Sequence, residues 1–394
     1  MKKIALSTLS LALMGAAGAA HAQSSVTLYG IIDTSFTYVN HVNGNNSLYS
    51  ISNTNAGDLS GSRWGLKGTE DLGGGLSAIF QLENGFDPGN GKLQQGSRMF
   101  GRQAFVGLQS NQYGTVTLGR QYDPSVDLVQ AITEDNYFGS AFATPGDVDN
   151  YDNSFRVSNA IKYLSPVYAG FQVEGMYAFG GVPGSTGQGM TWALGAAYNN
   201  GPIALAASYV NTRNTNPTGT ALKRSSWTST SDGPFDTFNS ANPTVNFGYQ
   251  TANAIKIVRV AGQYTLGQFT LGASFSNALY TADGFSTFAS TQKYNTAQGF
   301  VNYQLTPAML LGLGYNYTHA SGDTNASYNQ VSAGADYSLS KRTDVYLVGA
   351  WQHASGNQGD ASGGSVPAVA SVGSYGYGGT STQLLLSVGL RHKF

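Results

Sequence analysis

Hydrophobic and polar residues alternate with a period of two along most of this 394-residue chain. The alternation is clear in residues 25–40, 170–180, 307–320 and 342–354. Because successive side chains of a β-strand point to opposite faces, each segment predicts a strand with one apolar and one polar face. In the first segment the apolar row is Val26, Leu28, Ile32, Phe36 and Tyr38, and the opposite row is Thr27, Tyr29, Asp33, Ser35 and Thr37.

The connections between these strands alternate between short and long. Short turns are predicted at residues 70–75, 111–114, 165–170, 199–202, 266–268, 305–307 and 339–341, with longer polar segments between the resulting hairpins. Counting from Ser25 to Phe394 gives sixteen strands, and an even number with short turns at one end is typical of transmembrane barrels. A propeller or solenoid should show a fixed repeat, which this sequence lacks. We predict an all-β fold, a 16-stranded antiparallel transmembrane β-barrel.

The last predicted strand, TQLLLSVGLRHKF, ends the chain. Its apolar row includes Leu386, Val388 and Phe394, whereas Arg391 and Lys393 lie on the other row. An unpaired terminal strand invites aggregation, but pairing with the first strand closes the barrel and removes both edges. A barrel of about 16 strands is wide enough to hold an aqueous channel.

Composition excludes two other classes. Only 10% of the residues are charged, whereas about a quarter are charged in soluble domains. Helical membrane proteins need apolar stretches of about 20 residues, and none follows the N-terminal segment. Cysteine is absent, which excludes disulfides, thiol nucleophiles and Cys-based zinc sites.

The N-terminal segment predicts export. Lys2 and Lys3 precede an uncharged run from Ile4 to Ala20, and Ala20-His21-Ala22 matches a cleavage site. We interpret residues 1–22 as a cleaved signal peptide and 23–394 as one barrel domain, because no linker or compositional break divides it. A transmembrane anchor is the alternative for the first segment, but the cleavage site favours removal.

The chain from Gln23 to Phe394 resembles the Gram-negative general porins, which are trimeric, 16-stranded outer-membrane channels. The resemblance rests on the segments SSVTLYGIID, SRWGLKGTEDLGGGLSAIFQLENGF, GRQAFVGL, YGTVTLGRQYDP, NSFRVSNAIKY and SVGLRHKF. It implies a homotrimer in the outer membrane, in contact with lipid and lipopolysaccharide and built by the barrel-assembly machinery. It also implies passive passage of ions and small hydrophilic solutes, no nucleic-acid partner, and Phe394 as the assembly signal.

Basic residues are candidates for one wall of the pore. Arg63 and Lys67 share a row opposite Trp64 and Leu66, and Arg156 lies opposite apolar neighbours in the same way. Arg102 and Arg120 instead share rows with apolar residues, so a bulge near a glycine or an apolar stretch of lumen wall is needed to turn them inward. The resemblance implies lumen arginines at Arg63, Arg102, Arg120 and Arg156. The alternative is that they are solvated arginines at a rim.

Residues 123–153 carry seven acids and no base. The segment is also long and rich in apolar and aromatic residues, and the resemblance matches it to the third external loop, which folds into the barrel of porins. We predict Glu134 and Asp135, followed by Asp127, as the acids of the constriction. A solvated external loop is the alternative. Seven acids facing five or six bases predict a weak preference for cations.

Nothing in the sequence indicates an enzyme. The histidines are scattered without metal spacing or a nucleophile partner, and no Ser, His and acid can be assigned to one rim. We therefore expect no catalytic residues, no metal and no cofactor. A substrate-selective channel for sugars or organic anions remains the alternative to a general diffusion porin, because the sequence does not locate an aromatic path along the lumen.

Overall fold

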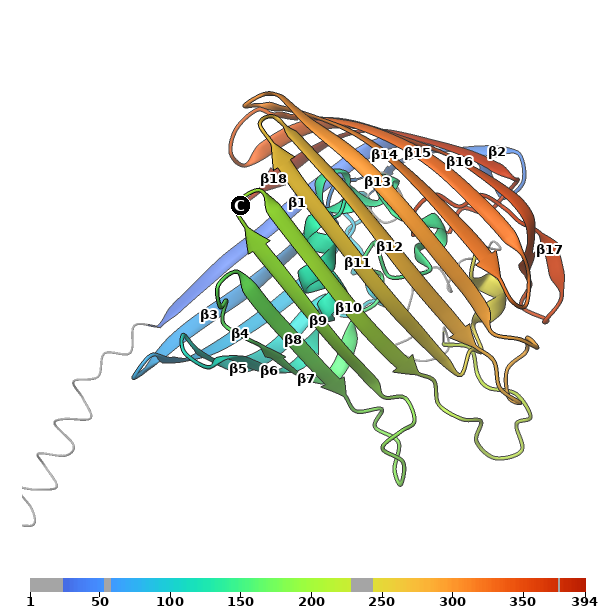
Figure 1. The fold of residues 1–394 in the computed structure, drawn as a ribbon, viewed down its shortest axis with the longest axis horizontal. Helices are drawn as coiled ribbons and strands as arrows, with labels where there is room; N and C mark the ends of the chain where they lie inside the picture. The colour runs from blue at the N-terminus through green and yellow to red at the C-terminus, as the bar shows by residue number, and fades with distance from the viewer. Residues whose placement is uncertain (1–23, 53–57, 228–243, 375) are drawn as a thin grey trace, which may run out of the picture.

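A computed structural model describes residues 24–52, 58–227, 244–374 and 376–394, and the predicted signal peptide lies outside them. These residues form one antiparallel sheet that curls into a barrel (Figure 1). The strands are β1 Ser25–Val42, β2 Asn46–Ser52, β3 Arg63–Gly73, β4 Leu76–Gly85, β5 Gln103–Ser110, β6 Gly114–Gln121, β7 Val157–Leu164, β8 Phe171–Ala178, β9 Thr191–Asn200, β10 Ile203–Arg213, β11 Ala254–Leu266, β12 Phe269–Thr281, β13 Gln292–Thr306, β14 Met309–Ser321, β15 Ala326–Ser338, β16 Thr343–Gly359, β17 Ser365–Pro367 and β18 Thr382–Lys393.

The first and last strands close the barrel. Residues Ile31 to Val39 of β1 pair with Lys393 to Leu385 of β18, while the start of β1 pairs with β3. Strand β18 in turn pairs with β16. The short strands β2 and β17 only extend the outer ends of β1 and β16, so sixteen strands form the wall. The predicted 16-stranded barrel is confirmed.

The two faces of the wall match the predicted rows. In β1, Val26 and Phe36 are 65% and 54% exposed, whereas Asp33 and Thr37 are fully buried. The exposed apolar row would contact lipid and the polar row faces the barrel interior. No helix in the described part of the chain is both long and apolar enough to cross a membrane.

The two ends of the barrel differ in the length of their connections. The seven predicted turns join strands from β3–β4 to β15–β16, at the end where β1 begins and β18 stops (Figure 1). The DLGGGL segment is one of them, and Gly73, Gly74 and Gly75 all have positive φ angles of 63 to 84° there, a conformation that favours glycine. The long connections lie at the opposite end.

The connection between β6 and β7, residues 122–156, folds into the barrel and is called the inward loop below. It contains the short helices η1 Ser125–Val129, η2 Gln130–Ile132, α2 Asp135–Phe138, η3 Gly139–Phe142 and η4 Pro145–Asp147. Phe138 is fully buried against β14 and β15, where a Cβ on Gly312 or Gly334 would collide with its ring. Gln330 on β15 donates to the carbonyl oxygen of Ala141 at 3.1 Å. The loop is thereby held against the wall formed by the later strands.

Candidate functional site

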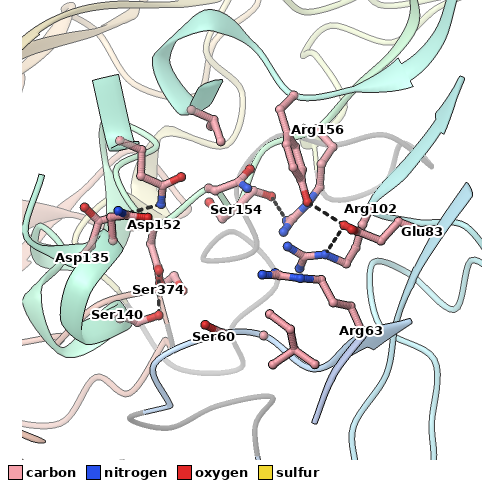
Figure 2. A pocket seen from close by; sticks show the side chains of 18 of the residues that line it. Ser60, Arg63, Glu83, Arg102, Asp135, Ser140, Asp152, Ser154, Arg156 and Ser374 are labelled. Atoms are coloured by element: carbon pink, nitrogen blue, oxygen red, sulfur yellow. Dashed lines mark hydrogen bonds and ion pairs between the residues drawn. The ribbon is translucent and has the colours of Figure 1, made fainter. Parts of the chain in front are cut away.

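A cavity of about 620 Å3 separates the inward loop from the wall of early strands. Figure 2 shows three arginine side chains on one side of it, Arg63, Arg102 and Arg156, with Asp135 and Asp152 on the other. This cavity inside the barrel is therefore flanked by guanidinium groups on the wall and by carboxylates on the loop.

The arginines reach this cavity from the ends of strands. Arg63 is the first residue of β3. Its side chain points inward, on the same face of the strand as Gly65, as the alternation predicts. Arg102 and Arg156 immediately precede β5 and β7, where the regular alternation has not yet begun. The alternation within β5 therefore does not fix the direction of Arg102, which explains how Arg102 points inward although Val106, in the same row of the sequence, faces outward.

A buried acid and a tyrosine lie within this arginine group. Glu83 on β4 accepts from Arg102 Nε at 2.8 Å, from the Tyr122 hydroxyl at 3.1 Å and from the Tyr29 hydroxyl at 2.8 Å. The guanidinium carbons of Arg102 and Arg156 each lie 5.9 Å from the centre of the Tyr122 ring. Glu83 offsets one positive charge. The sequence analysis missed it, although it shares the inward row of Gln81 opposite Phe80 and Leu82.

Two predicted wall residues do not line this cavity. Lys67 faces the lumen nearer the short turns, where its Nζ lies 5.3 Å from the centre of the Tyr29 ring. Arg120 donates from Nε to the Gly101 carbonyl and from Nη1 to Ser158 Oγ, both at 2.7 Å. The ladder is irregular beside it, between Gly119 and Gln121, which is the first of the two explanations that the sequence left open. Of the five predicted wall residues, Arg63, Arg102 and Arg156 are the three that line the cavity in the described part of the chain.

Three of the seven loop acids line the cavity, namely Asp127, Asp135 and Asp152. The other four loop acids accept hydrogen bonds from residues of the loop itself or of the opposite wall of the barrel. Glu134 is fully buried and accepts from Asn302 Nδ2 on β13 at 3.1 Å, so it points away from the arginines. Asp123, Asp147 and Asp149, which do not line the cavity, each accept from a serine or threonine hydroxyl of the loop itself.

Burial lowers the negative charge that the loop carboxyl groups carry at neutral pH. It raises the pKa of Asp135 to about 7, an effect that the Arg259 guanidinium and hydrogen bonds from Thr133 and Gln130 only partly oppose. It also raises the pKa of Glu134 to about 9, so this group is neutral at pH 7. Asp127 forms an ion pair with Lys162 of β7. At neutral pH the loop therefore presents less charge than its acid count predicts.

Arg259 on β11 holds the loop in place. It is 1% exposed, donates from Nη1 to the carbonyl oxygen of Asn150 at 2.9 Å, and lies 4.5 Å from the centre of the Tyr151 ring. The sequence analysis did not single it out. The signal was present, because Arg259 shares a row with Ile257 and Ala261 opposite Val258 and Val260.

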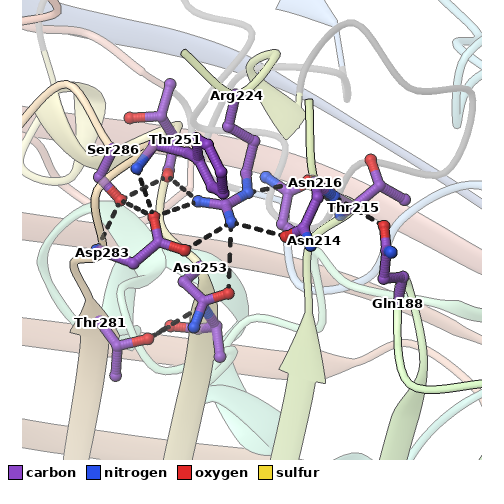
Figure 3. Close-up of polar contacts among 12 residues, drawn as sticks. Gln188, Asn214, Thr215, Asn216, Arg224, Thr251, Asn253, Thr281, Asp283 and Ser286 are labelled. Atoms are coloured by element: carbon purple, nitrogen blue, oxygen red, sulfur yellow. Dashed lines mark hydrogen bonds and ion pairs between the residues drawn. The ribbon is translucent and has the colours of Figure 1, made fainter. Parts of the chain in front are cut away.

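The outer mouth is braced by a buried arginine of another loop. Arg224, between β10 and β11, forms a bidentate ion pair with Asp283, between β12 and β13, at 2.8 and 2.7 Å (Figure 3). Its Nε donates to the Thr215 carbonyl at 2.8 Å, and its other nitrogen atoms reach Thr251, Asn216 and Asn253. One side chain thereby ties several outer segments together.

We predict that R224Q loosens this mouth without opening the barrel wall. Losing the charged hydrogen bonds should cost about 2–3 kcal/mol of local stability. External protease should then cleave residues 214–227 faster in membrane-embedded protein, while R224K should show a smaller effect because it keeps the charge. Hydrogen bonds from Arg224 hold the pKa of Asp283 below its ordinary value, so the brace should persist at pH values above about 4. Equal cleavage rates for wild type and R224Q would contradict this role.

Comparison with known proteins agrees with this geometry. Residues 8–357 match the family model described as Gram-negative porin. The chain is 33% identical over 395 residues to an outer membrane porin protein of Bordetella pertussis, covering 89% of this chain and 94% of the relative. It is 39% identical over 219 residues to outer membrane porin protein 32 of Delftia acidovorans, covering 52% of this chain and 58% of that one.

Two solved structures share the fold. The anion-selective porin from Comamonas acidovorans superimposes with a TM-score of 0.70 at 24% identity, covering 94% of this chain and 100% of that one. The outer-membrane expressed OmpT of Vibrio cholerae gives a TM-score of 0.62 at 16% identity, covering 94% and 98%. At these identities the likeness concerns the fold alone.

Proposed function

The chain belongs to the Gram-negative porin family, and from that premise we propose that the cavity between Arg63, Arg102 and Arg156 and the inward loop is its constriction. The protein is an outer-membrane porin, a water-filled channel for passive passage of ions and small hydrophilic solutes. The observation that carries the proposal is the placement of guanidinium groups opposite Asp135 and Asp152 across one cavity. Opposite charges across a narrow gap create a transverse field that orients water and dipolar solutes.

The charges at this constriction are nearly balanced. The sequence analysis predicted a weak cation preference from seven acids, but only three of these line the cavity, and one of the three is paired with Lys162. Glu83 and Asp58 add acids on the other sides, and burial raises the pKa of Asp58 well above its ordinary value. We propose that ion preference is weak near neutral pH and moves toward anions as the pH falls.

The pH dependence of the ion preference can be measured in a planar bilayer with a potassium chloride gradient near 0.1 M, where the Debye length is about 10 Å. A carboxyl group with a raised pKa loses its charge as the pH falls through that pKa. Because the pKa of Asp135 is about 7, the reversal potential should move toward the chloride value between about pH 8.5 and about pH 5.5. D135N should remove most of this shift, whereas E134Q should retain it. A pH-independent potential contradicts the assignment of Asp135, and an absence of conducting steps contradicts the channel itself.

We also propose that three copies assemble. The outward rows of the early strands expose a broad apolar band, with Leu28 at 59% and Val106 at 57%, that can serve partly as subunit interface and partly as lipid contact. Contacts with lipopolysaccharide and with the barrel-assembly machinery stay predictions.

The trimer predicts two readouts. Unheated protein should migrate on a gel as a species three times the mass of the heated monomer, and closures in bilayer recordings should occur in three equal steps. Migration only as a monomer in the unheated sample, or closures in single steps, would contradict the trimer.

A further inference from the structure

A second cavity, of about 330 Å3, lies beneath the inward loop and is called the lower cavity below. Leu128 and Asp127 of η1 face it from the loop, and wall strands β4 to β8 supply the rest of its lining. Leu164 pairs with both Thr115 and Glu174 in the ladders next to short turns, so the lower cavity lies between the constriction and the short-turn end. Asp127 lines both cavities.

Glu174 on β8 is a buried carboxylate with almost no partners. It is 2% exposed, and neither of its carboxylate oxygens has a hydrogen bond in the described part of the chain. Lys162 Nζ lies 3.5 Å from Oε1, but the same ammonium group pairs more closely with Asp127 and donates to the Tyr122 carbonyl at 3.2 Å. A buried carboxylate without donors is costly, so this position favours an added proton donor or cation.

The lining restricts the chemistry of that cation. Without a cation in the cavity, burial favours a proton on Glu174. A cation that takes the place of this proton faces Asp127 and Glu174 against Lys162, a formal charge of minus one, which suits a monovalent ion. The lining contains no histidine or cysteine, which transition metals prefer. Phe105, Leu164 and Leu128 add an apolar surface next to the carboxylates, which fits a short alkyl chain better than a bare ion.

We propose that the lower cavity binds small primary alkylammonium ions. The ammonium group donates to the free oxygens of Glu174, assisted by Asp127, and the alkyl chain packs against Phe105 and Leu164. The inference rests on the proposed function, because the ligand reaches this site through the pore. The channel then carries two regions of opposite character, with arginines around the constriction and a cation site next to it on the short-turn side.

The test is channel block by n-butylammonium in planar bilayers, with the amine added to either side of the membrane. Wild-type current should fall in a saturable manner, and E174Q should weaken the block by about tenfold or more. E70Q is the matched control, because Glu70 is exposed near a short turn and lines neither cavity. Butyrate tests whether the ligand must carry a positive charge. Tetramethylammonium tests whether the ligand must donate hydrogen bonds. Both ions should block weakly in all variants.

A second variant keeps the test decisive if E174Q does not insert. K162M removes the competing ammonium group and should strengthen the block by butylammonium. Equal block of wild type, E174Q and K162M would overturn the proposal, and equal block by tetramethylammonium would overturn the primary-ammonium assignment. Failure of the porin function itself is distinguishable, because wild-type protein would then give no conducting steps before any amine is added.

Discussion

Deleting Phe394 is expected to remove most of the assembled channel from the outer membrane while barely changing the stability of the channels that do form. The family resemblance identifies a terminal aromatic residue as the signal read during insertion. In the folded barrel Phe394 forms only the last rung of the seam, exchanging two backbone hydrogen bonds of 3.0 Å with Gly30. The residue is 41% exposed, so the partial burial of its side chain contributes about 1 kcal/mol.

The rest of the seam explains why the folded state should survive this deletion. The pairs from Ile31 with Lys393 to Val39 with Leu385 remain, and Arg391 keeps its 3.0 Å ion pair with Asp344 on β16. Outer-membrane fractionation and urea unfolding of the purified channel measure the two effects separately. Phe394→Tyr keeps the aromatic ring and should assemble normally. Normal outer-membrane levels of the truncated chain would remove Phe394 from its proposed role.

Replacing Arg63 and Arg102 together by glutamine should shift the channel toward cations and raise its conductance. The double variant removes two of the three guanidinium groups that line the constriction, and it leaves the Glu83 carboxylate without its 2.8 Å partner. The net charge of the arginine side of the transverse field then falls from about plus two to about zero, because Glu83 offsets the remaining Arg156, and shorter side chains widen the gap. The shift should be greatest at low ionic strength, because salt screens it.

R120Q is the matched control for this experiment. It removes the same charge from a residue that the resemblance assigned to the wall but that does not line the cavity. Its reversal potential should equal that of the wild type. If the double variant leaves the reversal potential unchanged in a salt gradient, Arg63 and Arg102 do not form the constriction.

Most of the barrel could be predicted because the bilayer imposes the same rule on every wall strand. One face meets lipid and the other meets water, so Phe36 and Asp33 reveal their directions through local alternation alone. The closure of β1 on β18 followed from the same logic, since an open edge would be exposed. Glu83 and Arg259 lie on regular strands, and the same rule would have placed both inward.

The constriction was harder to predict because most of its residues, unlike Arg63, lie outside the regular strands. Arg102 and Arg156 precede their strands, and the inward loop has no period to follow. Glu134 and Asp135 are adjacent in the sequence, yet the turn into α2 sends one toward Asn302 on β13 and the other to the cavity. The pairing of Asp127 with Lys162 depends on contact between a loop helix and β7, which one sequence does not reveal.

The absence of cysteine permits a direct test of whether ions cross the cavity between the arginines and the inward loop. Ala131 is exposed and lines that cavity, whereas Lys341 is exposed on a short turn outside it. In bilayer recordings of A131C, a charged thiol reagent should lower the conductance, with reagents of opposite charge moving the reversal potential in opposite directions, and K341C should respond to neither. Complete labelling of A131C, verified by mass, with unchanged conductance and reversal potential would contradict the account.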